Sequence, residues 1–166
     1  MFKTRIPFLA GIATGIYAIE TLIPKPLPWL RLGLSNAVVL CVLATFGFKY
    51  GLLVSIVRTT VGSFITGMFL TPFFFFGLSG GIVSTCVMWI AYTGWKKIFS
   101  LIGISILGAL AHNITQFFLA YVMFIKRVEV FYLLPVFILL SLVAGTITGF
   151  GAIYLKRIFT PAFVSG

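Results

Sequence analysis

Six polar residues lie inside otherwise apolar stretches of this chain, and their side chains are the ones most able to do chemistry: Glu20, Asn36, Arg58, His112, Asn113 and Gln116. A charged side chain in lipid costs roughly 2.5–3.5 kcal/mol on insertion scales, so such residues are kept for a function or a structural pairing. Together they supply hydrogen-bond donors, acceptors and a positive charge. We predict that they bind a solute, with Arg31 in a loop attracting an anionic one.

The spacing of these residues favours a shared, inward-facing surface. Ser105, Gly108, His112 and Gln116 recur at three- and four-residue steps, as on one face of a helix. A structural alternative remains open, in which Arg58 and Glu20 form an ion pair that only holds helices together, and His112 is a satisfied core group.

The composition places the chain in a membrane. Hydrophobic residues make up 61% of it, the mean hydropathy is +1.20, and charged residues make up 8%, against about 25% in soluble domains. Twelve Lys and Arg oppose two acidic residues, but they come singly or in pairs between apolar runs. That distribution is typical of membrane anchors and argues against nucleic acid as a partner.

The elements that must position the polar residues are predicted to be six transmembrane helices in one domain, residues 1–166. A bilayer needs about 20 apolar residues per helix, and prolines, glycines and charges divide the chain. The second helix is short, so it is tilted or only partly spans. The predicted helices are about Ile6–Ile23, Leu34–Phe46, Tyr50–Leu70, Phe73–Tyr92, Ile98–Phe124 and Phe131–Leu155.

An even number of spans places both termini on one side of the membrane. The loops and ends on that side hold seven Lys and Arg, and those on the other side hold four. Because basic residues concentrate on the cytoplasmic side, we predict cytoplasmic termini.

The scarcity of acidic residues argues against catalysis. Prenyl and phosphoryl transfer need Mg²⁺ held by clustered carboxylates, whereas this chain has no Asp and only Glu20 and Glu129. A glycine-rich phosphate loop ending in Lys-Ser or Lys-Thr is also missing. Cys41 and Cys86 have no partner at metal spacing. We therefore expect no enzyme activity, cofactor or metal, and any transport must draw energy from a partner or an ion gradient.

Small residues in the first predicted helix form a surface on which another helix can pack closely. Gly11 and Gly15 stand four residues apart, with Ala18 nearby. Two interpretations remain open: packing inside the monomer, or docking to a partner subunit.

Several motifs resemble the Gx transporter family, whose members carry the label heptaprenyl diphosphate synthase component I and are similar to the substrate-binding S components of energy-coupling factor (ECF) transporters. The resemblance lies in Arg31-Leu32-Gly33-Leu34-Ser35-Asn36, Phe46-Gly47-Phe48-Lys49-Tyr50-Gly51, Leu53-Val54-Ser55-Ile56-Val57-Arg58, Gly80-Gly81 and Leu107-Gly108-Ala109-Leu110-Ala111-His112-Asn113 with Gln116. It implies a six-helix S-component fold in the bacterial cell membrane. It also implies a site opening outward beneath the loop between helices one and two, and a T component with two ATPase subunits as partners.

Two functions are carried forward. The first is a substrate-binding membrane subunit for uptake of a small anionic or polar aromatic solute, such as a vitamin or cofactor precursor, beneath a lid from Pro24 to Gly33. The alternative is a non-catalytic membrane scaffold linked to isoprenoid or quinone synthesis or to electron transfer.

Overall fold

The computed structural model describes residues 2–23, 33–95 and 98–159, and within these ranges it contains helices and no strand. The all-α prediction is confirmed there. The elements in chain order are α1 (Phe2–Leu22), α2 (Asn36–Phe46), α3 (Phe48–Ile65), α4 (Pro72–Gly94), α5 (Leu101–Ala120), the π-helical η1 (Tyr121–Ile125), the 3₁₀-helical η2 (Val128–Leu133) and α6 (Leu134–Phe159).

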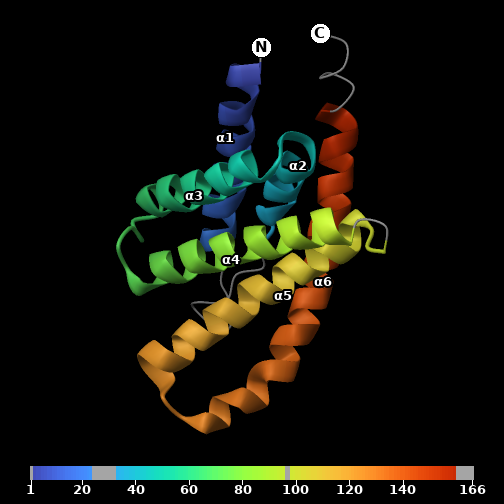
Figure 1. Ribbon diagram of the computed structural model, residues 1–166. Coiled ribbons are helices and arrows are strands. Elements are labelled where there is room, and N and C mark those ends of the chain that lie inside the picture. Colours follow the sequence, from blue (N-terminus) through green and yellow to red (C-terminus); the bar gives the residue numbers. More distant parts are fainter. Residues whose placement is uncertain (1, 24–32, 96–97, 160–166) are drawn as a thin grey trace.

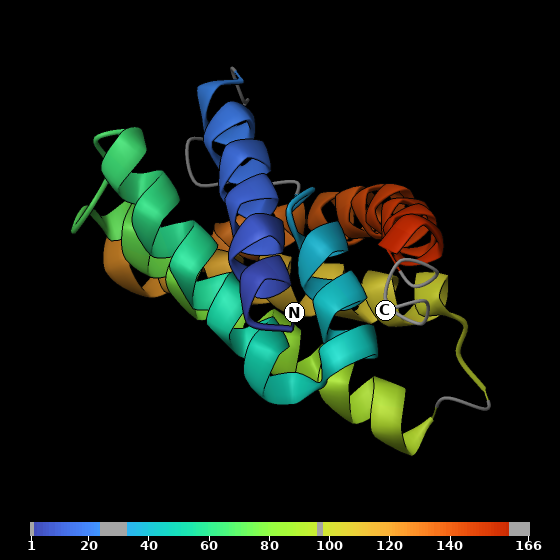
Figure 2. The same cartoon turned by 90° about the horizontal axis from the view of Figure 1, so that it is seen from above.

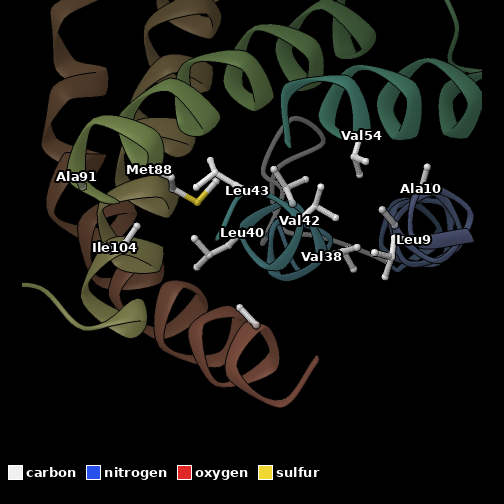
Figure 3. Packing of buried hydrophobic residues seen from close by; sticks show 13 residues of the cluster. Leu9, Ala10, Val38, Leu40, Val42, Leu43, Val54, Met88, Ala91 and Ile104 are labelled. Atoms are coloured by element: carbon white, nitrogen blue, oxygen red, sulfur yellow. The ribbon is translucent and has the colours of Figure 1, made fainter. Parts of the chain in front are cut away.

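The short helix α2 lies at the centre and packs against all five other α-helices (Figures 1 and 3). Every residue from Asn36 to Leu43 is buried, which explains why this stretch is apolar all round rather than on one face. Leu40 and Leu43 point towards Met88 of α4 and Ile104 of α5, while Val38 points towards α1 (Figure 3). Helix α2 is therefore the element around which the others are placed.

The start of α1 and the end of α6 lie at the same end of the molecule (Figures 1 and 2). The rings of Phe8 and Phe159 meet edge to face there, with centroids 6.3 Å apart. This arrangement agrees with an even number of membrane crossings. That the shared side is cytoplasmic stays a prediction.

Turn residues set the helix boundaries, and the predicted end of the third helix is wrong. Helix α3 ends at Ile65 and not at Leu70, because Gly67 and Leu70 both have positive φ, which no α-helix accommodates. Pro72 then occupies the first turn of α4, where its missing N–H costs no hydrogen bond. The predicted fifth helix is α-helical only to Ala120 and continues as η1.

Three helical segments are long and apolar enough to cross a bilayer by length and composition: Pro72–Gly94, Leu101–Ile125 and Val128–Phe159. Helix α2 has 11 residues and rises about 16 Å, roughly half the hydrocarbon thickness, so its predicted shortness is confirmed. Helices α1 and α3 carry charges at Arg5, Glu20, Lys49 and Arg58. The chain is therefore built like a membrane protein, and six crossings remain a prediction.

Two apolar clusters occupy the interior at different levels. The larger, here called the termini-side core, joins α1, α2, α3, α4, α5 and the last part of α6, and Leu9, Leu40, Met88 and Ile104 belong to it. The smaller, here called the hairpin core, consists of Phe117, Val130 and Phe137 with the partly buried side chains around them. Along α5 the termini-side core ends after Ile104, and the hairpin core begins at Phe117.

Candidate functional site

Between the two cores lies a set of buried polar side chains, here called the polar layer. All of its members are less than one-tenth exposed: Glu20, Ser35, Asn36, Ser55, Arg58, Ser84, His112, Asn113, Gln116 and Ser141. They come from α1, the turn before α2, and all of α2 to α6. Along α5 this layer lies between the two apolar cores, and the buried side-chain atoms without a partner among the described residues belong to it.

Arg58 joins α3 to the beginning of α2. Its guanidinium, 2% exposed, donates to the hydroxyl of Ser35 and to Oδ1 of Asn36, the latter over 2.5 Å. Ser35 precedes the first residue of α2 and makes no side-chain cap to that helix; its oxygen accepts from Arg58 instead. The positive charge therefore sits at the N-terminal end of α2, where the helix dipole is also positive. Both favour a negative charge nearby.

Glu20 holds the turn that leads into α2. One carboxylate oxygen accepts from the backbone N–H of Gly33 over 2.6 Å, and the other accepts from that of Leu34 over 3.1 Å. Gly33 has φ +72°, and its own carbonyl accepts from the N–H of Asn36. The ion pair with Arg58 that the sequence left open is therefore not what engages the carboxylate oxygens. The contacts of Glu20 are those of a residue that positions Ser35 and Asn36.

Gly80 and Gly81 of α4 lie between Arg58 of α3 and His112 of α5, and they allow both side chains to approach α4 closely. A Cβ added to Gly81 would lie 2.8 Å from Oγ of Ser55 and 3.6 Å from Nη2 of Arg58. A Cβ added to Gly80 would lie 2.9 Å from Nδ1 of His112. Any side chain at these positions would push the polar groups of α3 and α5 away from α4, so the pair sets the width of the polar layer.

Asn113 is fixed in orientation by a chain of hydrogen bonds to α6. Ser141 donates its only hydroxyl proton to the carbonyl of Phe137 over 2.6 Å, so its oxygen can only accept from Asn113. The group of Asn113 that faces it at 2.8 Å must then be the NH₂ group. Oδ1 of Asn113 consequently points elsewhere as a bare acceptor.

Several members of the polar layer have no hydrogen-bond partner within the part of the chain that the structure describes. These atoms are Oγ of Ser55, Oγ of Ser84, Oδ1 of Asn113, and both Oε1 and Nε2 of Gln116, which is fully buried. Nearby threonines behave differently: Thr59 and Thr85 donate to carbonyls of their own helices. Leaving a buried polar group unsatisfied costs about 1–3 kcal/mol, so these atoms indicate a site for water or a solute.

The structure brings most of the predicted site residues into one layer. Arg58 and Asn36 are in direct contact, Glu20 is joined to them through residues 33 and 34, and His112 reaches the same level across Gly80. Arg31 and most of the predicted lid, Pro24 to Gly33, lie outside the described residues. Ser35 and Ser55 were not predicted as site residues, and neither were Ser84 and Ser141. The signal for the latter two was a run of small residues at three- and four-residue steps: Gly77, Gly80, Gly81 and Ser84 in α4, and Ser141, Ala144, Gly145 and Thr148 in α6.

The predicted docking face on α1 points away from the described helices. A Cβ added to Gly11 or Gly15 would meet no atom within 4 Å, and both glycines are exposed, with Ala18 half-buried beside them. Ala10 and Thr14, on the adjoining side of the helix, are buried. Within the described part of the chain, these two glycines therefore do not serve packing inside the monomer, and docking to a partner stays a prediction.

A match to a known protein family spans most of the chain. Residues 9–155 match the family described as heptaprenyl diphosphate synthase component I. Comparisons with curated proteins and with solved structures returned no match. The matched range contains α2 to α5 and every residue of the polar layer. The chain therefore belongs to the heptaprenyl diphosphate synthase component I family.

Proposed function

We propose that this protein is a substrate-binding membrane subunit, similar to the S components of ECF transporters, for uptake of a small anionic or polar aromatic solute. One observation carries the proposal: the buried polar layer holds five side-chain oxygen and nitrogen atoms without a partner among the described residues. A purely structural network would have satisfied them, because half-satisfied networks are costly.

Charge supports an anionic or electron-rich solute. The chain has twelve Lys and Arg and two acidic residues, and one of those acids, Glu20, is already engaged by backbone N–H groups. The buried guanidinium of Arg58 and the N-terminal end of α2 lie together in the same layer. Both attract negative charge.

Partners supply the energy in this proposal, because the chain has no nucleotide-binding loop and no clustered carboxylates. A T component and two ATPase subunits would take that role, and the outward face of α1 at Gly11, Gly15 and Ala18 offers a surface for helix docking. The same lack of carboxylates supports a non-catalytic subunit.

Thermal unfolding in detergent tests the proposal directly. A solute present at 100 times its dissociation constant stabilises the folded state by about 2.7 kcal/mol, so the binding member of a panel of vitamins, cofactor precursors and prenyl phosphates should raise the unfolding temperature. Arg58→Ala should abolish that rise. Thr93→Ala is the matched control, because Thr93 bonds only within α4. No rise with any solute, in a protein that remains folded, would refute the proposal.

The family description itself favours a second candidate. "Component I" of a synthase describes one part of a complex, which agrees with a scaffold that anchors a prenyl-transferring partner. The scaffold predicts co-purification with a soluble, carboxylate-rich enzyme and an unchanged complex after Arg58→Ala. The transport subunit predicts co-purification with ATPase subunits and loss of solute binding in that variant.

A further inference from the structure

We infer that Gln116 and Asn113 form hydrogen bonds to a planar N–H/C=O edge of the solute, so that the site selects ring compounds that carry a C=O group between two N–H groups, or a carboxamide group. The inference rests on the proposed function and names the substrate class of the same site. It is carried by two side chains whose hydrogen-bonding capacity can be counted.

Gln116 offers a complete amide to the site. It is fully buried, and neither its oxygen nor its nitrogen has a partner among the described residues. An amide presents one acceptor and two donors in a plane, and the group that satisfies an acceptor and a donor side by side is another N–H/C=O pair. A simple anion supplies only acceptors and would leave Oε1 of Gln116 bare.

Asn113 adds one acceptor of known direction. Its NH₂ group is committed to Ser141, whose proton is committed to the carbonyl of Phe137, so the free Oδ1 can be satisfied only by a donor. Residues 113 and 116 are neighbours on one face of α5, yet the two amides do not bond each other. The guest must therefore bring at least two N–H donors and one acceptor along one edge.

The neighbouring helix provides a hydrophobic wall for a ring. Two contacts fix the antiparallel register of α4 and α5: Gly80 faces His112, and Gly108 faces Ser84 and Met88. The same register brings Phe76 to the level of Gln116, and Phe76 is 1% exposed and packs edge to face on Phe124. A flat ring with a polar edge satisfies both kinds of surface.

Paired probes test the inference on the full-length protein in detergent. The probes are uracil, lumazine and lumichrome, each compared with its fully N-methylated form, and nicotinate and a prenyl phosphate serve as anions without such an edge. We expect at least one N–H probe to raise the unfolding temperature, and its N-methylated form to bind about 10- to 100-fold more weakly, since a buried acceptor would lose its donor.

Variants assign the preference to the side chain. Gln116→Met keeps a similar volume without the amide and should fold at least as stably without probe, but it should lose the preference for N–H over N-methyl probes. Thr115→Val is the matched control, because Thr115 bonds only to the carbonyl of Ala111, and it should keep the preference.

Each other outcome counts against the inference in a distinguishable way. The inference is overturned if both probe forms bind equally, or if Gln116→Met keeps the preference for N–H over N-methyl probes. Stabilisation by nicotinate or the prenyl phosphate alone overturns it while the proposed function stands. If no probe binds and a high-resolution structure shows only water on Gln116, both this inference and solute binding fail.

Discussion

The substitution Glu20→Gln separates a positioning role from a charge-pairing role for the only buried acid of the chain. The carboxylate accepts two backbone hydrogen bonds, from Gly33 and Leu34. Glutamine keeps one acceptor and turns an NH₂ group towards the other N–H. One charge-assisted bond is lost and the second becomes neutral, which together should cost about 2–4 kcal/mol.

That loss should lower the unfolding temperature by about 4–16 °C, since about 2–4 °C corresponds to 1 kcal/mol in a protein of this size. Hydrogen exchange supplies the local readout: the amides of Gly33 and Leu34 should exchange faster, while those of α6 should not. Glu129→Gln is the control, because Glu129 is exposed, and surface changes are usually worth less than 0.5 kcal/mol. Unchanged exchange at residues 33 and 34 in Glu20→Gln would refute the positioning role.

Three further predictions concern packing, orientation and topology. Gly145→Ala should lower the unfolding temperature by several degrees, because the new Cβ would lie 2.5 Å from Cα of Ile106. Gly15→Ala is the control: its new Cβ would meet no atom within 4 Å, so the unfolding temperature should stay unchanged or rise slightly. An equal effect of both substitutions would contradict the packing argument. Ser141→Ala should destabilise the protein by about 1–3 kcal/mol, because the buried NH₂ group of Asn113 would lose its acceptor. Thermal unfolding measures this loss, and an unchanged unfolding temperature would disprove it. Reporter fusions to the two chain ends should report the same side of the membrane, and opposite sides would exclude an even number of crossings.

The sequence predicted the helical class and the important residues better than it predicted their partners. Apolar runs and basic flanks are strong signals, so each α-helix was anticipated. The end of α3 was missed because Phe64 to Leu70 is as apolar as a helix, and only the positive φ of Gly67 and Leu70 distinguishes it as a turn. Burial of Arg58 and Gln116 followed from their place in apolar runs. Contacts of Arg58 with Ser35 and Asn36 depend on how α2 enters the bundle, which no local pattern encodes.

Glu20 and Gln116 show that a rare polar residue in an apolar chain is energetically costly to bury, but that its burial alone does not show that it binds a ligand. Both are buried, and from the sequence they looked equally suited to touch a solute. Counting donors and acceptors separates them. The two oxygens of Glu20 are used by the chain itself, whereas the amide of Gln116 is used by nothing in the described residues. A fold that satisfies one buried group at this level, and leaves its neighbours without a partner among the described residues, fits the proposal that a solute supplies their hydrogen bonds.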